Sequence, residues 1–357
     1  MSRVDRRTLF KLGAGIGAMA CLAPIASSSL SIGDAGAEAT PVRLRLGAGW
    51  PLYGNLLGLS TRRLAQRIQW LTGGAVAVDL VDIGTGSLPA LADIGDIPVD
   101  AWHAAAHLWP GAPPVWSLFG MQTFGMTAPE IRVWRATAPG LDQRERLAAR
   151  AGLNVWFTGE VAAGGMAIRG KGWPGSGRVA CSPGSSALWE RLGFDTITRT
   201  PAAGLGAVVN GEAVAAEVPP LLAGPVRRLG EAGLGYVRFG TFSPGMATEL
   251  LVKSPAIATL PADLQAKIAQ ACAEEAAALS AEAAQDEQRW LTDAAEANLL
   301  VDMPADSVVR AGRTAGDLLR SLESDAYAHD TVDAYRKVRR HLGATAAGCC
   351  VNHTAFG

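Results

Sequence analysis

The sequence lacks several features that would place it in a class directly. Its 357 residues include only five cysteines, which excludes a scaffold built from disulfides. The net charge is −1, so no basic excess points to a nucleic-acid partner. No uninterrupted apolar run reaches the roughly 18 residues of a membrane-spanning helix. The motifs Gly-x-Ser-x-Gly, His-Glu-x-x-His and Cys-x-x-Cys, which mark common hydrolases, metalloproteases and redox proteins, are also missing.

What is present indicates a folded α/β protein. The hydrophobic fraction of 49% excludes a disordered chain, and 357 residues suffice for two domains of ordinary size. There is no fixed-period repeat and no low-complexity linker. Strand-like and helix-like segments alternate along the chain, which favours an α/β architecture in two lobes.

The first 37 residues have the order of an export signal. Arg6 and Arg7 precede a weakly apolar stretch over residues 12–26, and a segment of small residues ends at Ala37. The adjacent arginines resemble a twin-arginine signal, which is an address read by a receptor. We therefore expect residues 1–37 to be a removable signal peptide and the mature chain to be periplasmic.

Removal of this signal leaves four cysteines. Cys349 and Cys350 are adjacent and unsuited to pairing with each other. The envelope is oxidising and would permit a disulfide between Cys181 and Cys272, but their spacing alone does not show that one forms.

The mature chain opens with a β-α-β pattern. Residues 42–46 alternate apolar and basic side chains, residues 56–71 carry apolar residues at helical spacing, and residues 75–81 form a second strand. Gly73 and Gly74 end the helix. This order predicts a parallel strand pair with a right-handed crossover.

The clearest single element is a long helix near the C-terminus. It begins at Leu260-Pro261 and runs to about Ala297 without glycine or proline, through an alanine-rich stretch. At 1.5 Å per residue such a helix is about 45 Å long or longer. We expect it to run across both lobes.

Several stretches of the chain form a recognisable set by their order and spacing: Leu71-Thr72-Gly73-Gly74, Thr123-Phe124-Gly125, Arg178-Val179-Ala180-Cys181-Ser182-Pro183 with Leu192-Gly193, Gly211 with Glu217-Val218-Pro219, and Leu260-Pro261 with the helix that follows. Together they resemble the periplasmic solute-binding proteins of TRAP (tripartite ATP-independent periplasmic) transporters, the DctP-like family. The resemblance covers about Leu44 to Leu342. Within the family, the chain resembles the branch that binds mannitol, chloroaromatic and oxo acids.

The resemblance implies a two-lobed periplasmic-binding-protein fold with a long C-terminal spine helix. Its lobe boundaries would be residues 41–160 for lobe I, with a contribution from about 218–252. Residues 161–217 would form lobe II, with a contribution from about 253–342, and residues 343–357 would be a C-terminal tail. Such a clamp captures a small organic acid and delivers it to TRAP membrane permease subunits. The sequence does not decide whether the protein forms a homodimer.

The resemblance also implies site residues. The family's strand arginine, which forms a bidentate salt bridge with the ligand carboxylate, corresponds to Arg178. Arg169 resembles a second family arginine. Glu217 matches a family glutamate that in some members holds a metal ion beside the substrate, whereas the family's asparagine is Val218 here. Because most polar positions that orient a ligand are aliphatic in this chain, we expect an aliphatic or aromatic monocarboxylate and no cofactor.

Further candidates for the pocket wall follow the expected strands, because open α/β sheets bind ligands at strand ends. Trp50 and Tyr53 follow the first strand, and His103, His107 and Trp109 follow the third. Phe242 lies where some family members place aromatic residues.

The sequence is also compatible with two alternative functions. His103 and His107 have i, i+4 spacing, so on a helix they would form half of a metal site in an exported metal- or cofactor-dependent enzyme. The same clamp fold would also serve a binding protein that signals to a membrane sensor instead of feeding a permease. The enzyme is the weaker hypothesis, since the sequence has no third metal ligand, and no nucleophile with a base, at a spacing typical of a catalytic site.

Overall fold

The computed structural model describes residues 40–83, 88–162, 164–238, 245–325 and 328–347. Residues from Thr40 onward form one compact unit. The expected signal peptide, Cys349, Cys350 and Phe242 lie outside the described residues. Among the described helices, none is both long and apolar enough to span a membrane.

A five-stranded sheet forms the first lobe. Its order is β2-β1-β3-β10-β4, with β1 at Val42–Ala48, β2 at Val76–Leu80, β3 at Ala101–Ala104, β4 at Leu153–Ala162 and β10 at Gly245–Lys253. β1 pairs in parallel with both β2 and β3, whereas β10 runs antiparallel to β3 and β4. The predicted β-α-β opening is confirmed. Its helix α1 spans Leu56–Leu71 and begins where the side chain of Asn55 accepts a hydrogen bond from the Gly58 amide.

A six-stranded sheet forms the second lobe. Its order is β11-β9-β5-β8-β6-β7, with β5 at Gly165–Arg169, β6 at Arg178–Cys181, β7 at Asp195–Thr198, β8 at Ala215–Glu217, β9 at Leu234–Arg238 and β11 at Leu300–Val301. β6 is parallel to β7 and to β8, so the carboxyl ends of these three strands lie at one edge of the sheet. β5 runs antiparallel to β8.

The chain crosses between the sheets more than once. β4 leads from the first sheet to β5 in the second, and β10 returns to the first sheet. The boundaries differ from the sequence expectation at β9, which lies within the segment 218–252 assigned to lobe I but pairs with β5 in the second sheet. The return to lobe I therefore comes after Arg238.

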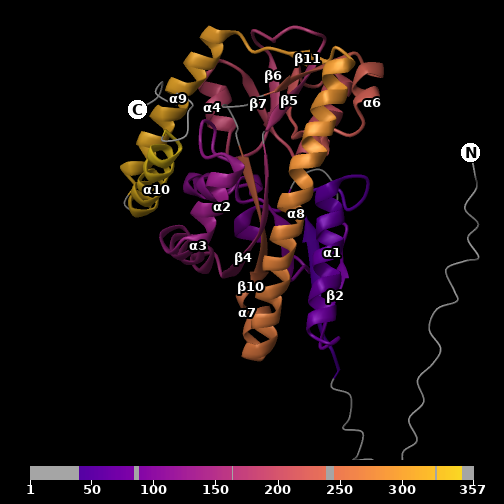
Figure 1. Cartoon of the computed structure of the whole chain (residues 1–357), viewed down its shortest axis with the longest axis vertical. Helices are drawn as coiled ribbons and strands as arrows, with labels where there is room; N and C mark the ends of the chain where they lie inside the picture. Colours follow the sequence, from indigo (N-terminus) through magenta and orange to yellow (C-terminus); the bar gives the residue numbers. More distant parts are fainter. Residues whose placement is uncertain (1–39, 84–87, 163, 239–244, 326–327, 348–357) are drawn as a thin grey trace, which may run out of the picture. The chain divides into compact units, whose positions relative to one another are not determined.

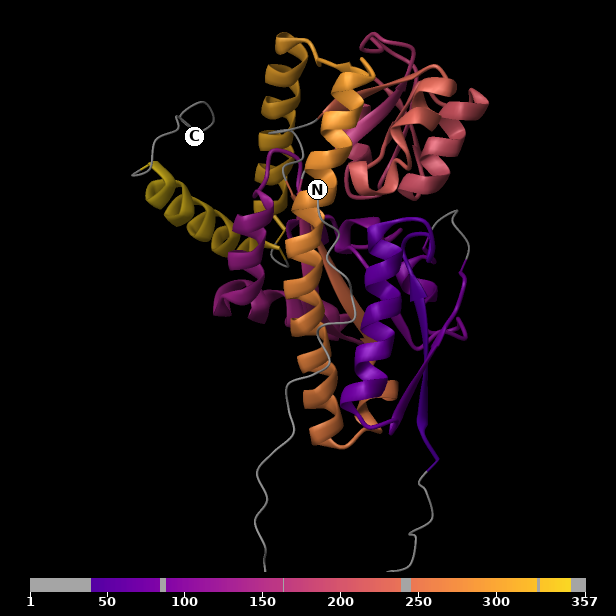
Figure 2. The same ribbon diagram turned by 45° about the vertical axis from the view of Figure 1, so that its right-hand side comes forward.

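The long helix α8, at Ala262–Glu296, matches the expected spine. It packs against β4 and α1 of the first lobe and against η4 (Pro220–Leu222) and α6 (Val226–Glu231) of the second lobe. Figures 1 and 2 show this helix passing alongside both sheets. Its Glu275 is buried and accepts hydrogen bonds from Arg63 of α1, with both nitrogen–oxygen distances at 2.7 Å.

The C-terminal helices add a further crossing. α9, at Ala305–Glu323, packs on α4 (Ser186–Arg191) of the second lobe, and α10, at His329–Ala347, packs on α2 (Ala128–Ala136) and α3 (Ala138–Arg150) of the first (Figure 1). Tyr335 of α10 anchors this return, because its hydroxyl accepts a 3.0 Å hydrogen bond from the Met126 amide. Residues 343–347, expected to be tail, belong to α10.

The two buried cysteines belong to different parts of the core. Cys181 lies in an apolar cluster of the second lobe, beside Leu188 and Trp189, and Cys272 lies in a cluster of the first lobe. Both thiols are free. The disulfide left open by their spacing is therefore not formed, because each side chain fills its own core.

Candidate functional site

Two adjoining pockets lie between the two lobes, at the carboxyl edge of the parallel strands β6, β7 and β8. Ser182, Arg199 and Val218 each follow the last residue of one of these strands. The outer pocket is lined by Leu88, Ala90, Leu108, Pro110, Pro183, Thr198, Arg199 and Thr200. The inner pocket is lined by His107, Leu108, Met121, Gly164, Gly165, Ser182, Arg199, Pro201, Glu217, Val218, Pro219 and Met246. Leu108 and Arg199 line both.

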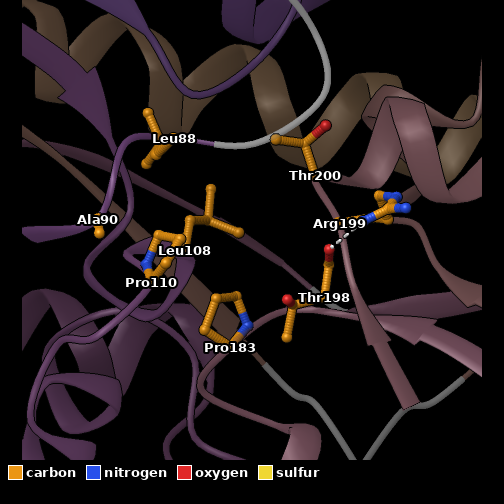
Figure 3. Close-up of a pocket in the computed structure, with 8 residues that line it drawn as sticks. All are labelled: Leu88, Ala90, Leu108, Pro110, Pro183, Thr198, Arg199 and Thr200. Carbon is orange, nitrogen blue, oxygen red and sulfur yellow. Dashed lines mark hydrogen bonds between the residues drawn. The ribbon is translucent and has the colours of Figure 1, made fainter.

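The outer pocket has a volume of about 270 Å³. Figure 3 shows Leu88, Leu108 and Pro110 of the first lobe on one side and Thr198, Arg199 and Thr200 of the second lobe on the other, with the Arg199 guanidinium turned toward the Thr198 carbonyl. The guanidinium of Arg199 is exposed, and its Nη1 donates to the carbonyl oxygen of Thr198 at 3.1 Å (Figure 3). This pocket therefore offers one cation against a largely apolar wall.

Local sequence explains the position of Arg199. β7 ends at Thr198, and helix α5 (Pro201–Asn210) begins two residues after Arg199, capped by Thr200. Thr and Pro at a helix start are a common combination. Arg199 is thus held in the short link between the strand and the helix, at the edge where open α/β sheets bind ligands.

The inner pocket is small, about 20 Å³, and its polar centre is Glu217. The carboxylate is 6% exposed. Oε2 accepts hydrogen bonds from the Ser182 amide at 2.9 Å, from Ser185 Oγ at 2.5 Å and from Ser182 Oγ at 3.2 Å. Oε1 accepts from Trp189 Nε1 at 2.7 Å. Glu217 thereby fixes the loop after β6 onto the end of β8.

Burial raises the pKa of Glu217, and the hydrogen bonds from Ser185, Ser182 and Trp189 oppose that rise. The donors around this carboxylate come from its own lobe. Glu217 therefore serves first to shape the wall of the inner pocket, with both oxygens already engaged.

A metal ion does not fit this donor set. Glu217 is the only acidic residue among the described residues that line the pockets, and both of its oxygens accept protein hydrogen bonds. Within the described residues, no group of three or more His, Cys, Asp or Glu side chains is placed to hold a metal. A hard cation needs several free oxygens at one point.

Arg178 and Arg169 lie at the opposite edge of the second sheet. Arg178 is exposed at the first residue of β6, four residues before Ser182, or about 13 Å of extended strand. Arg169 ends β5, and its Nη2 donates to the Val208 carbonyl oxygen at 3.0 Å. The structure does not bring either guanidinium to the pockets, so their role in ligand binding stays a prediction. The cation that lines the pockets is Arg199.

Three of the predicted wall residues belong to the core of the first lobe. Trp50 is 3% exposed and donates from Nε1 to Thr61 Oγ1 at 2.9 Å. Trp109 is 1% exposed and packs edge-on against Trp102. His103 is fully buried between Thr61 and Thr158. These large side chains fill the space beneath the strand ends and do not line the pockets.

Tyr53 lies at the surface, 73% exposed, with the Arg62 guanidinium 4.8 Å from its ring centroid. Val218 does line the inner pocket; its amide donates to the Gly165 carbonyl oxygen at 2.9 Å.

His103 and His107 do not share a helix, because His103 is in β3 and His107 is in the one-turn helix η2 (Ala106–Leu108). The suggested histidine pair is therefore wrong.

Sequence reasoning missed Arg199, Met121 and Met246 as pocket residues. The signal for Arg199 was available, since an arginine directly after a strand and before Thr-Pro stands at a strand's carboxyl end. Met246 had no such signal, because it comes from an antiparallel strand of the other lobe.

No protein-family model matches the chain, and no protein of curated function matches it in sequence. Solved structures do match it in fold. A TRAP transporter solute-binding protein from Bordetella bronchiseptica, described with calcium and picolinate in one site and another site apo, has 18% sequence identity and a TM-score of 0.75; the match covers 87% of this chain and 95% of that one.

A TRAP periplasmic solute-binding protein from Pseudoalteromonas atlantica, described with sodium and pyruvate, has 17% identity and a TM-score of 0.76 over 87% of this chain and 97% of that one. An extracytoplasmic solute receptor from Bordetella pertussis, described as binding pyroglutamic acid, has 15% identity and a TM-score of 0.68 over 83% and 99%. The chain thus has the two-lobed α/β fold of TRAP solute-binding proteins, as the sequence predicted.

Proposed function

We propose that this chain is the periplasmic solute-binding subunit of a TRAP transporter, and that it captures a small organic monocarboxylate between its lobes for delivery to membrane permease subunits. The observation that carries the proposal is the outer pocket. It combines Arg199, the only cation among the described residues lining the pockets, with Leu88, Leu108, Pro110 and Pro183. A guanidinium matches a carboxylate by its planar pair of donors, and the apolar wall suits an uncharged body.

The fold supports the same conclusion. Similar solved proteins are described with picolinate, pyruvate and pyroglutamic acid, which carry one carboxylate, and another is described with malonate, which carries two. A cavity of about 270 Å³ is near the lower end of the range for ligand pockets, so the acid is small. One cation favours a monoanion over a dicarboxylate, because a second carboxylate would be buried without a partner.

The donor set supports binding without a metal ion, since both oxygens of Glu217 accept hydrogen bonds from protein donors. The enzyme hypothesis loses its main support, because His103 and His107 occupy separate elements. A sensor that signals instead of feeding a permease would use the same site. Loss of uptake on deletion of the TRAP membrane subunits distinguishes transport from sensing.

The test is a thermal-shift screen of small carboxylates, with picolinate, pyruvate, pyroglutamate and malonate included, on the wild type, Arg199→Ala and Arg178→Ala. A ligand at 100 times its Kd adds about 2.7 kcal/mol of stability. We expect a monocarboxylate to stabilise the wild type and Arg178→Ala and to have little effect on Arg199→Ala. If the acid still stabilises Arg199→Ala as it stabilises the wild type, but no longer stabilises Arg178→Ala, the carboxylate binds at Arg178 and not at Arg199.

A further inference from the structure

His107 lies where the two lobes meet. It belongs to η2 of the first lobe, is 4% exposed and lines the inner pocket. Its carbonyl oxygen accepts a 3.0 Å hydrogen bond from the amide of Gly184, which is in the loop after β6 of the second lobe. The imidazole is therefore buried by elements of both lobes.

The neighbouring His103 provides a direct comparison. Both rings are buried, but His103 has partners for both nitrogens: Nδ1 lies 2.8 Å from Thr61 Oγ1, and Nε2 lies 2.9 Å from Thr158 Oγ1. Nδ1 of His107 is buried and has no partner among the described residues. Buried polar side chains nearly always have hydrogen-bond partners. His103 is thus part of the core, whereas His107 has hydrogen-bonding capacity that its own lobe does not use.

The geometry decides which nitrogen is open to a ligand. Nδ1 faces the backbone of Gly120 so closely that a Cβ on that glycine would lie 2.7 Å from it. A ligand can therefore reach only the Nε2 side of the ring. Buried N–H groups without partners are rarer than buried acceptors without partners, which favours the proton on Nε2.

We propose that His107 is a ligand-binding residue whose neutral ring donates an Nε2–H hydrogen bond to an acceptor atom of the bound acid. This rests on the proposed function, in which Arg199 from the opposite lobe holds the carboxylate. Arg199 lines both pockets and His107 lines the inner one, so an acid in the outer pocket whose acceptor atom reaches into the inner pocket uses donors of both lobes and holds the lobes together. The ligand class is a small monocarboxylate with an acceptor close to the carboxylate, such as an oxo, hydroxyl or ring nitrogen group.

The position of His107 between the lobes makes the closing of the two lobes on the ligand sensitive to pH. The polar and charged residues of the second lobe that line the inner pocket with His107 are Arg199, Ser182 and Glu217; Glu217 accepts hydrogen bonds from its own lobe. The first lobe presents the Gly120 backbone, Met121 and Met246. Charging the ring would place a cation in a closed pocket shielded from water, and this desolvation is the cause that lowers the pKa of His107.

Burial lowers the pKa of His107 to about 3, whereas an imidazole in separated lobes titrates near 6.5. The closed form therefore requires the neutral ring, is fully favoured above about pH 6.5 and weakens as the pH falls below it. Between pH 7.5 and pH 5.0 the Kd should rise about 30-fold.

The experiment is calorimetric titration of the mature wild type, His107→Leu and His107→Gln with two matched pairs of acids. Pyruvate and propionate differ by an oxo group, and picolinate and benzoate differ by a ring nitrogen. We expect the wild type to prefer the acceptor-bearing acid of a pair by about tenfold. His107→Leu should lose both this preference and the acid-side loss of affinity. His107→Gln should retain part of the preference, through its amide donor, but lose the pH dependence.

Each outcome separates the two proposals. If the wild type binds none of the four acids, the proposed function fails, and the role of His107 fails with it. If the wild type binds and His107→Leu keeps both the preference and the pH profile, only the role of His107 is overturned. Circular dichroism melting checks the fold of each variant, and if His107→Leu does not fold, the pH profile of His107→Gln decides.

Discussion

At the scale of single residues, the first lobe buries more positive than negative charge around Glu249. Arg135 Nη2 and Arg144 Nε each lie 3.0 Å from Glu249 Oε2, and all three side chains are at most 2% exposed. The Arg144 guanidinium also lies 4.0 Å from the ring centroid of Trp116, so an aromatic face offsets part of the excess charge.

We expect Glu249→Gln to destabilise the protein severely. The substitution leaves Arg135 and Arg144 buried without a counter-ion, which costs about 3–5 kcal/mol. Chemical denaturation measures the change, with Glu212→Gln at an exposed position as the control. A loss no larger than that of the control would mean that the arginines are not held by Glu249.

Glu287 of α8 gives a stability effect that depends on pH. It is 5% exposed, and burial raises its pKa to about 7, with Arg238 opposing the rise. A carboxyl with a folded-state pKa above its unfolded value of 4.5 favours folding below pH 4.5 and loses that contribution as the pH rises toward 7.

Glu287→Gln should therefore stabilise the protein at pH 8, on the order of 1–3 kcal/mol, and change little at pH 4.5. Melting temperatures at the two pH values test this, with the exposed Glu296→Gln of the same helix as the control. Equal effects at both pH values would show that the pKa of Glu287 is not raised in the folded protein.

At the scale of elements, the loop between β6 and α4 forms the contact that brings the lobes together. The Gly184 amide donates to the His107 carbonyl oxygen, and a Cβ on Gly184 would lie 2.9 Å from the His107 Cβ and 3.2 Å from its carbonyl oxygen. The glycine is needed for the close approach of the first lobe, since the three atoms nearest to that Cβ all belong to His107.

Gly184→Ala should therefore weaken ligand binding while the fold survives. Overpacking at a close contact costs about 1–3 kcal/mol, or roughly 5- to 150-fold in Kd if it falls on closure. Calorimetry with the acid selected by the screen measures it. Gly172→Ala, where a Cβ meets nothing within 4 Å, is the matched control. Equal affinities for the two variants would exclude Gly184 as a closing contact.

Elements with strong local signals could be predicted from the sequence. Apolar spacing and Gly73 defined α1, and the absence of glycine and proline defined α8. The candidate site was harder to predict from the sequence, because the inner pocket is lined by residues far apart in the chain, such as Arg199 and Met246. The family motif directed attention to Arg178, which the structure places at the amino edge of its sheet. Trp50 and Trp109 were correctly placed after strands, but their bulk fills the core.

At the scale of the whole molecule, the lobes are joined by the β4–β5 link, by α8, and by the return of α10 to the first lobe. Two lobes joined by several crossings can close by a hinge motion. Small-angle scattering of the mature chain should show a smaller radius of gyration with the bound acid than without it. An unchanged radius at saturation would contradict a closing clamp.

The most direct test of carboxylate capture at Arg199 is a calorimetric cycle. It combines wild type and Arg199→Ala with an acid from the panel, such as picolinate, and the corresponding amide. Arg199 is exposed in this structure, so the acid must cover its guanidinium on binding. Truncating one partner of the charge pair that then becomes buried costs on the order of 2–5 kcal/mol, or roughly 30- to 4,000-fold in Kd. The predicted result is that the amide binds the wild type far more weakly than the acid does, whereas Arg199→Ala hardly distinguishes the two. Simple addition of the two losses would contradict contact between Arg199 and the carboxylate.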